Sequence, residues 1–347
     1  MNRAGQNDFP LTKRRHWVNL VGDEEKANMG ATSKSAILVG PAGWSYTDWA
    51  GIVYPHHKPR GFHEAAYLAQ FFDTIEINTS FYSPPRAEFV KAWAAKVAFN
   101  PNFKFSAKLW KRFTHECNAN LQDEKEFKHG LAPLMNDGRL GALLVQLPWS
   151  FKNTPENHEY LSGLIMQFME YPLVLEVRHG SWNKPEVFEW LVDLGVGFCN
   201  IGQPVIGQSI APSDHATAPV GYVRLHGRNY DHWFTSSEHP EERYNYLYSQ
   251  AELEPWAARI QNVARNAELT FVITNNHFEG KAIANALQLI ALLRNQRVPV
   301  PESMLESYPE LEKIAAHEAL FTLPKQSDLL FAPGNPGSSE ESARKSN

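Results

Sequence analysis

The sequence predicts an α/β protein folded as a single (β/α)8 TIM-type barrel, and three observations lead to this fold class. Eight short apolar runs, bounded by polar or turn-forming residues, occur between residues 36 and 275. Most gaps between them carry apolar residues at helical spacing. A chain of 347 residues also accommodates one barrel of about 250 residues with extensions at both ends. Strands that alternate with helices in this way form parallel sheets.

Each predicted strand is one of these apolar runs. In chain order they are Ala36–Val39, Thr74–Ile77, Lys104–Lys108, Ala142–Leu147, Leu173–Arg178, Val196–Ile201, Val220–His226 and Leu269–Asn275. The helical patterns that follow them begin near Ala65 (with Leu68 and Phe72), Val90, Leu161, Leu253 and Ile283. The stretch from Gly202 to Pro219 shows no helical pattern. A doubly wound sheet is the alternative, but Gly40-Pro41-Ala42-Gly43-Trp44 matches the required glycine-rich phosphate turn poorly.

The predicted barrel domain spans residues 35–325. Residues 1–34 and 326–347 are polar and lack periodicity, so we expect disordered tails there. Hydrophobic residues make up 43% of the chain and charged residues 20%, which is typical of a soluble globular protein. Oligomeric state and the role of residues 295–332 are not indicated by the sequence.

The charge and cysteine content favour a cytoplasmic protein with a small-molecule partner. A net charge of −5 disfavours a surface that coats nucleic acid or anionic membrane. Cys117 and Cys199 occur in no CxxC or metal-finger spacing, which is typical of free thiols in a reducing compartment. Neither a secretory leader nor a stretch long enough to span a membrane is visible.

Charged and amide side chains stand at the ends of the predicted strands. Alternate residues of a strand share a face, so Glu176 and Arg178 point together, as do Arg224 and His226. An apolar strand normally excludes charge, because burying an unpaired ion is costly. Several strands that end in such residues therefore predict a polar cavity where their carboxyl ends meet, which is where barrel enzymes have their active sites.

The acidic residues and one histidine are the candidate catalytic groups. Glu76 and Glu176 could serve as acid and base, and His226 as a proton donor or acceptor. The same three residues could form a carboxylate–imidazole metal site, but HxH, HExxH and Asp-rich motifs are absent from the sequence, so we predict no metal and identify no cofactor. For His226, a hydrogen bond within the core is the alternative.

The cations and amides predict how a ligand is bound. Lys108, Arg178 and Arg224 favour an anionic ligand such as a phosphate or carboxylate. An internal ion network without a ligand, in which Glu176 pairs with Arg178 or Arg224, is the alternative. The remaining predicted ligand-binding residues are Asn78, Gln146, Asn275 and Asn276, which would bond polar groups, and Trp44 and Tyr82, which would stack on a ring.

Seven ordered motifs between residues 36 and 294 resemble the YecE-like family, known as domain of unknown function 72. They include Gly43-Trp44-Ser45-Tyr46, Glu76-Ile77-Asn78-Thr79-Ser80-Phe81-Tyr82, Gln146-Leu147-Pro148, Glu176-Val177-Arg178-His179-Gly180-Ser181-Trp182 and Asn275-Asn276-His277-Phe278-Glu279-Gly280-Lys281. The resemblance implies a TIM barrel and no established reaction. It also implies an acid near Gly202, where this chain has glycine, so the chain is expected to bind differently or not at all if that acid holds a ligand.

The sequence thus favours an enzyme that acts on an anionic, ring-bearing small molecule, such as a sugar phosphate or a nucleotide fragment, by acid/base chemistry. One alternative is a protein that binds such a ligand without chemistry. Another is a metal-dependent nuclease or phosphoesterase, which would show salt-sensitive binding and metal-dependent cleavage.

Overall fold

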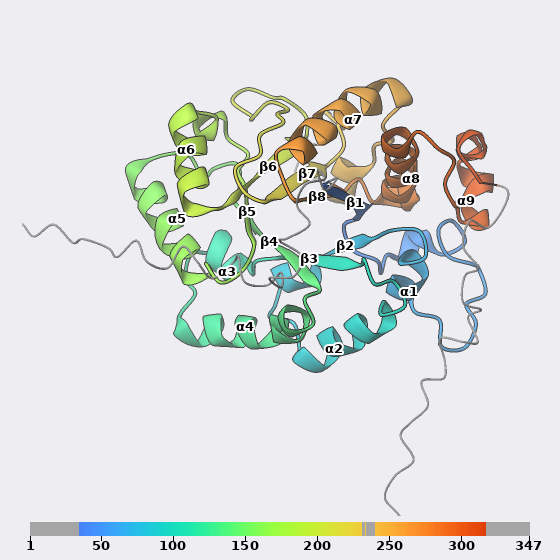
Figure 1. Cartoon of the computed structure of the whole chain (residues 1–347), viewed down its shortest axis with the longest axis horizontal. Coiled ribbons are helices and arrows are strands. Elements are labelled where there is room, and N and C mark those ends of the chain that lie inside the picture. The colour runs from blue at the N-terminus through green and yellow to red at the C-terminus, as the bar shows by residue number, and fades with distance from the viewer. Residues whose placement is uncertain (1–34, 231–232, 234–239, 317–347) are drawn as a thin grey trace, which may run out of the picture. The chain divides into compact units, whose positions relative to one another are not determined.

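The computed structural model describes residues 35–230, 233 and 240–316, and its strands form an eight-stranded, nearly closed parallel barrel (Figure 1). The sheet order is β1-β8-β7-β6-β5-β4-β3-β2. Between β1 and β2 the ladder is reduced to a bridge between Ala42 and Glu76, beside which Gly43 N–H donates to Glu76 O at 2.8 Å. The strands are β1 (Ala36–Pro41), β2 (Thr74–Ile77), β3 (Lys104–Lys108), β4 (Leu140–Gln146), β5 (Leu173–Glu176), β6 (Gly197–Gly202), β7 (Val220–Leu225) and β8 (Leu269–Thr274).

The predicted fold class is confirmed. The predicted bounds of β2 and β3 are those found, and the ends of the other strands differ by one or two residues. The predicted tails, residues 1–34 and 326–347, lie outside the described residues, as do residues 317–325 of the predicted barrel domain. No helix in the described part of the chain is both long and apolar enough to cross a membrane.

Helices connect the strands along the outside of the barrel (Figure 1). They are α1 (Glu64–Leu68), α2 (Ala87–Lys96), α3 (Lys111–Thr114), α4 (Leu121–Asn136), α5 (Pro155–Gln167), α6 (Pro185–Leu194), α7 (Gln250–Arg265), α8 (Lys281–Arg294) and α9 (Glu302–Ser307). Capping boxes begin the two longest, because Asn120 pairs with Asp123 before α4 and Ser249 with Glu252 before α7. These reciprocal bonds satisfy backbone N–H groups that a helix start leaves unpaired.

The first helix is shorter than its apolar pattern indicates. Ala65, Leu68 and Phe72 follow helical spacing, but α1 ends at Leu68. Phe72 is still buried, because a turn continues beyond the helix and its N–H donates to Leu68 O at 3.0 Å. The spacing therefore predicted burial correctly and the length of the helix incorrectly.

The link from β6 to β7 contains no helix, as the sequence indicated. A buried side chain, Asn200, holds this link instead. Its Nδ2 donates to His215 O at 2.8 Å, and its Oδ1 accepts from Ser213 Oγ at 2.7 Å and His215 N–H at 2.8 Å. The side-chain amide of Asn200 therefore pairs with two backbone groups and one hydroxyl of this link. In a helix, such backbone groups would pair with one another.

The segment after α8 connects the loops that follow β1 and β8. Ser303 Oγ donates to Val53 O at 2.9 Å, and Tyr308 OH donates to Glu279 O at 2.6 Å. A bridge between Val298 and Ala315 closes the segment on itself. Residues 298–315 therefore hold loops at the carboxyl ends of two strands that pair in the barrel.

Candidate functional site

Every strand after β1 has, at its last residue or within two residues after it, a polar side chain on the face that points into the barrel. Tyr222 and Arg224 contact Glu76 inside the barrel, and the ladder register carries this inward face to the neighbouring strands. Because all the strands are parallel, their last inward side chains surround one mouth. These side chains are Asn78, Lys108, Gln146, Arg178, Gln203, His226 and Asn275.

Arg224 joins two buried carboxylates. Its Nε donates to Glu76 Oε2 at 3.0 Å and its Nη2 to Glu76 Oε1 at 2.7 Å, which is the forked geometry that guanidinium groups favour. Its Nη1 donates to Glu176 Oε2 at 3.2 Å. Exposure of the three side chains is 1% for Arg224 and 0% for both glutamates. We call Glu76, Glu176, Tyr222, Arg224 and His226 the inner cluster.

Glu176 accepts hydrogen bonds from three residues of the site. Arg178 Nε and Nη2 donate to its Oε1 at 3.1 and 2.9 Å, and His226 Nε2 lies 3.2 Å from the same oxygen. Burial alone would raise the pKa of Glu176, but Arg224, His226 and Arg178 together hold it well below its usual range. Glu176 is therefore ionised, and its pairs with both arginines match the internal ion network considered from the sequence.

His226 is neutral in the folded protein. Burial, reinforced by the charge of Arg224, lowers its pKa to about 3 despite the opposing charge of Glu176. Its Nδ1 lies 3.1 Å from Asn275 Nδ2. A tautomer with the proton on Nε2 satisfies both contacts, since Nε2–H donates to Glu176 and Nδ1 accepts from Asn275.

Tyr222 completes the coordination of Glu76. Its hydroxyl donates to Glu76 Oε2 at 2.9 Å and accepts from Ser106 Oγ at 2.9 Å. Burial raises the pKa of Tyr222 and that of the neighbouring Cys199 well above their usual values. Both groups therefore keep their protons, and Cys199 lacks the thiolate form that a nucleophile requires.

Lys108 differs from the other cations of the site. It ends β3 half-buried, with Nζ 4.3 Å from the centre of the Phe81 ring. No acidic side chain pairs with Nζ among the residues that the structure describes. Burial, together with the positive charge of Arg224, lowers the pKa of Lys108 to about 7. Its amine is therefore close to half protonated at neutral pH.

The site carries a surplus of positive charge. Arg178, Arg224 and protonated Lys108 face the carboxylates Glu76 and Glu176, while His226 stays neutral. The two arginines already neutralise the two carboxylates through direct ion pairs, so the surplus charge is on Lys108. An added anion at the mouth would therefore lie in a favourable potential.

The predicted stacking residues and Asn276 lie apart from the inner cluster. The Trp44 ring packs against Trp93 of α2 at 5.1 Å and Phe105 at 6.3 Å. Tyr82 is exposed and contacts Phe81 edge to face. Asn276 donates to Tyr246 O and to Asn285 Oδ1, both at 2.8 Å. Their predicted ligand contacts stay predictions.

Sequence reasoning did not assign Tyr46 or His115 to the site. Tyr46 OH donates to Ala42 O at 2.7 Å and accepts from Asn78 Nδ2 at 3.4 Å, and its ring stacks on His277 at 4.4 Å. Burial and the charge of Lys108 lower the pKa of His115 to about 4. Both residues stand in the loops after β1 and β3, so their place after strand ends was the available signal.

The family model described as "Protein of unknown function DUF72" matches residues 38–309. The chain belongs to this family. It is 29% identical over 272 residues to the UPF0759 protein YunF of Bacillus subtilis, covering 74% of this chain and 94% of YunF. Over 174 residues it is 25% identical to the UPF0759 protein YecE of Escherichia coli O157:H7, covering 49% of this chain and 58% of YecE.

A solved structure supports the same assignment. The crystal structure of the DUF72 family protein TM1631 from Thermotoga maritima aligns with a TM-score of 0.65 at 30% identity, covering 75% of this chain and 99% of that one. An Enterococcus faecalis DUF72 structure, EF0366, shares the fold with a TM-score of 0.65 at 24% identity, covering 74% and 95%. These relatives establish the family and the barrel, and their descriptions give no reaction.

Gly202 of this DUF72 protein faces outward. A Cβ on this residue would lie 2.8 Å from Leu225 Cδ2 and 2.9 Å from Trp256 Cζ2, in the layer between the barrel and α7. An acidic side chain at this position would therefore enter apolar packing, away from the inner cluster. The next residue, Gln203, faces inward instead.

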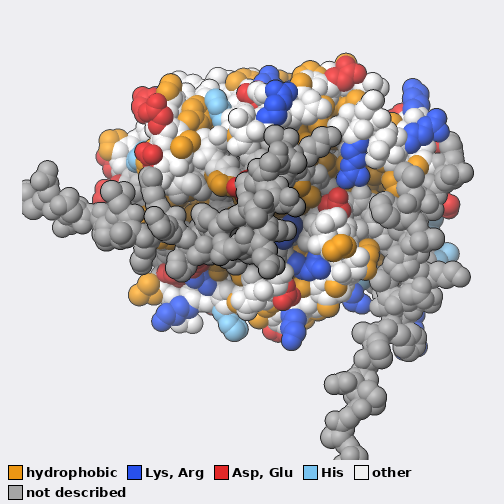
Figure 2. Space-filling view, viewed as in Figure 1, with side chains coloured by type: hydrophobic (Ala, Val, Ile, Leu, Met, Phe, Trp, Pro, Cys, Tyr) orange, Lys and Arg blue, Asp and Glu red, His pale blue; other side chains and the backbone are white. Residues whose placement is uncertain are grey.

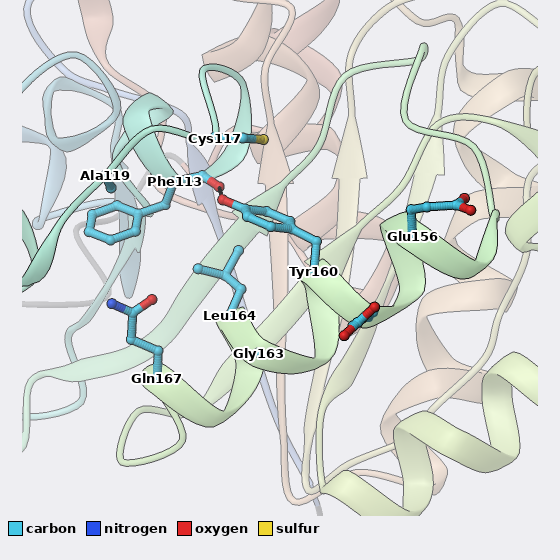
Figure 3. Close-up of a pocket in the computed structure, with 9 residues that line it drawn as sticks. Phe113, Cys117, Ala119, Glu156, Tyr160, Gly163, Leu164 and Gln167 are labelled. Atoms are coloured by element: carbon cyan, nitrogen blue, oxygen red, sulfur yellow. Dashed lines mark hydrogen bonds between the residues drawn. The ribbon is translucent and has the colours of Figure 1, made fainter.

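Two surface hollows of the DUF72 protein lie away from the strand ends. One, of about 430 Å³, lies beside α5, where Tyr160 OH donates to Phe113 O at 2.6 Å (Figure 3). The other, of about 490 Å³, lies between α6 and the β6–β7 link and includes Phe188 and His215. Neither is lined by a predicted site residue. Within the described ranges, no group of three or more His, Cys, Asp or Glu side chains could hold a metal ion.

Proposed function

We propose that this DUF72 protein is an enzyme that binds an anionic, ring-bearing small molecule at the mouth of its barrel and transfers a proton to it. The position of Lys108 is the observation that carries the proposal. It is a half-buried cation at the carboxyl end of a barrel strand, with no counter-ion among the described residues. An anionic ligand would supply the missing charge.

The inner cluster supports the proposal by fixing the cations in place. Arg178 has 17% of its side chain exposed, and Glu176 holds its guanidinium through two nitrogens. Arg178 and Lys108 thus present donors from β5 and β3, with Gln146 on the strand between them. In this role Glu76, Glu176, Arg224 and His226 orient the site, and the ligand itself contacts the side chains at the mouth.

Lys108 is the group best suited to move a proton. Its pKa of about 7 means that the free protein holds both forms at neutral pH. Binding of an anion would raise this pKa, so the amine takes up a proton from solvent and becomes the general acid for the bound molecule. Glu176 lacks a proton to donate in this arrangement, because Arg224, His226 and Arg178 hold its pKa well below the usual range. Both oxygens of Glu76 are already occupied by hydrogen bonds from Arg224.

A protein that binds the same ligand without chemistry is the second candidate. One observation favours it: each oxygen of both carboxylates and each nitrogen of His226 already has a partner within the protein. A nuclease has less support. On the part of the surface in Figure 2 that is not grey, acidic and basic side chains are interspersed, without the basic stripe that a phosphate backbone requires.

Titration calorimetry with inorganic phosphate, ribose 5-phosphate and glucose 6-phosphate tests the proposal. We expect binding at pH 7.5 with uptake of a fraction of a proton, measured from the enthalpy in two buffers of different ionisation enthalpy. Lys108→Met should weaken binding about tenfold or more, since it removes one charge-assisted contact, and should remove the share of the proton uptake that the lysine contributes beside the ligand's own phosphate. Mass spectrometry of the incubated ligand then shows whether it changes, which separates the enzyme from the binding protein.

Lys104→Met is the matched control. Lys104 begins the strand that Lys108 ends, and its Nζ donates to the carbonyl of Gly138 at the opposite end of the barrel. This variant should bind anions like the wild type. Failure of all three anions to bind, or equal binding by Lys108→Met, would remove the proposed function.

A further inference from the structure

Gln203 has a buried side-chain amide without a partner in the part of the chain that the structure describes. The residue is 2% exposed, and neither its Nε2 nor its Oε1 forms a hydrogen bond with a described residue. Buried amides are normally paired, so this group requires an explanation.

The ladder places Gln203 at the mouth beside His226. Ile201 pairs with Arg224 and Gly202 with Leu225, and His226 N–H donates to Gly202 O at 2.8 Å. Gln203 directly follows β6, and the alternation of side chains along the strand puts it on the same inward face as Cys199, whose Sγ lies 4.0 Å from Glu176 Oε2. We call the last inward residues of β2 to β6, namely Asn78, Lys108, Gln146, Arg178 and Gln203, the rim.

The neighbouring backbone leaves the amide of Gln203 without a local partner. The Gly202 carbonyl already accepts from His226 N–H and from Tyr248 OH at 3.3 Å. The following residue, Pro204, has no N–H to donate. A donor and an acceptor for Gln203 therefore have to come from outside the described chain.

We infer that Gln203 recognises the edge of a planar ring that carries a hydrogen-bond donor and an acceptor side by side, as a nucleobase does. This inference rests on the proposed function and names its substrate class as a nucleoside monophosphate. Lys108, the last residue of β3, and Arg178, just after β5, would bind the phosphate, and Gln203, just after β6, would bind the base.

The count of donors and acceptors favours a nucleobase over a sugar at Gln203. The amide offers one N–H₂ and one carbonyl in a plane, which match one acceptor and one donor on a base edge. A pair of sugar hydroxyls brings two donors and four lone pairs, more than one amide satisfies in a place closed to water. The Trp233 ring, 6.2 Å from that of His226, adds an aromatic group beside this position.

Binding measurements with matched ligands test the inference. The probes are the four ribonucleoside 5′-monophosphates, ribose 5-phosphate, and 1-phenylribose 5-phosphate, which has a ring but no donor or acceptor. We expect the best nucleotide to bind the wild type at least about tenfold more tightly than either of the other two compounds. In Gln203→Met this preference should fall to about twofold, while ribose 5-phosphate binds as before.

The melting temperature distinguishes recognition from a structural role. Because Gln203→Met removes an unpaired buried amide, the ligand-free variant should melt at the same temperature as the wild type or higher. A structural hydrogen bond to an ordered water would instead lower the melting temperature and leave the preference intact, and this result would overturn the inference. Gln208→Met, an exposed position in the same loop, is the control and should change neither quantity.

Different results would contradict the inference about Gln203 and the proposed function. If ribose 5-phosphate or the phenyl compound binds as tightly as every nucleotide, Gln203 does not form hydrogen bonds with a base edge. The anion site of the proposed function is then still supported. If no phosphate compound binds, the proposed function falls and the inference with it. Should Gln203→Met fail to fold, Gln203→Leu and the three-ligand comparison on the wild type still decide the question.

Discussion

The inner cluster and the rim differ in how completely their polar groups are paired. In the inner cluster, Arg224 donates to both oxygens of Glu76 and to Glu176 Oε2. Tyr222 also donates to Glu76 Oε2, and His226 Nε2 lies beside the other oxygen of Glu176. At the rim, the Lys108 amine has no counter-ion among the described residues, and both Gln203 amide atoms lack a partner.

Because of this difference, the inner cluster makes the barrel rigid, and the rim is the part that can recognise a ligand. A fully paired buried network has one favourable arrangement, and it holds the strand ends in register. Groups left unpaired at the rim retain their capacity for a ligand, at a cost in stability. We therefore expect substitutions in the inner cluster to change mainly stability, and substitutions at the rim to change mainly binding.

Removal of Arg224 should have the largest effect on stability. Arg224→Met leaves two buried carboxylates without their shared cation, which typically costs about 3–5 kcal/mol in the free energy of unfolding. Urea denaturation at pH 7 measures this loss. The difference in the free energy of unfolding between Arg224→Met and the wild type should become smaller as the pH falls, because protonation removes the unpaired negative charges. The exposed Arg265→Met should change the free energy by less than about 0.5 kcal/mol. A loss below about 1 kcal/mol in Arg224→Met would contradict the central place of this residue.

Titration of His226 should produce the next largest effect. Its folded pKa of about 3 lies below the ordinary value of 6.5, so the unfolded chain binds the proton more strongly. The stabilisation is complete above pH 6.5 and is lost as the pH falls toward 3. We expect about 2 kcal/mol of this loss between pH 7 and pH 5.

Comparison with His226→Gln isolates this contribution, since glutamine does not titrate. Between pH 7 and pH 5, the free energy of unfolding of the variant should fall by about 2 kcal/mol less than that of the wild type. Glu176, whose pKa is also lowered, loses its stabilisation in the same direction but below the ordinary carboxyl pKa of about 4.3. His57→Gln, at an exposed position, should keep the wild-type slope. An unchanged slope in His226→Gln would show that His226 is charged or accessible in the folded protein.

The alternation of side chains along strands made most of the inner cluster predictable. Because residues two apart share a face, the sequence alone placed Glu176 with Arg178 and Arg224 with His226. It did not determine which strands face each other across the barrel. The contact between Arg224 and Glu76 spans 148 residues and depends on closure of the sheet. For the same reason, the sequence did not show that Lys108, of the three cations in the site, would have no counter-ion among the described residues.

The rim residues were harder to predict because they lie at or after the ends of the apolar runs from which the strands were predicted. The predicted sixth strand stopped at Ile201, so Gln203, two residues further on the same face, was not considered. Trp44 shows the opposite difficulty. Its position after β1 predicts a ligand contact, which stays a prediction, and in the structure its ring packs against Trp93 and Phe105. A loop residue can face the mouth or the helices, and sequence position does not distinguish them.

A substitution at Gly202 should have the smallest effect of those considered, and it should change stability but not binding, because Gly202 lies next to the rim but faces away from it. Gly202→Ala adds a Cβ about 2.8 Å from Leu225 Cδ2 and 2.9 Å from Trp256. These side chains have to shift, so we expect a loss of about 1 kcal/mol in the free energy of unfolding, at the lower end of overpacking costs. Phosphate affinity should stay within about twofold of the wild type, since the rim keeps all its side chains. The two are measured by urea denaturation and calorimetry. A large loss of affinity with unchanged stability would place residue 202 in the site after all, and the glycine would then mark a real difference in what this chain binds.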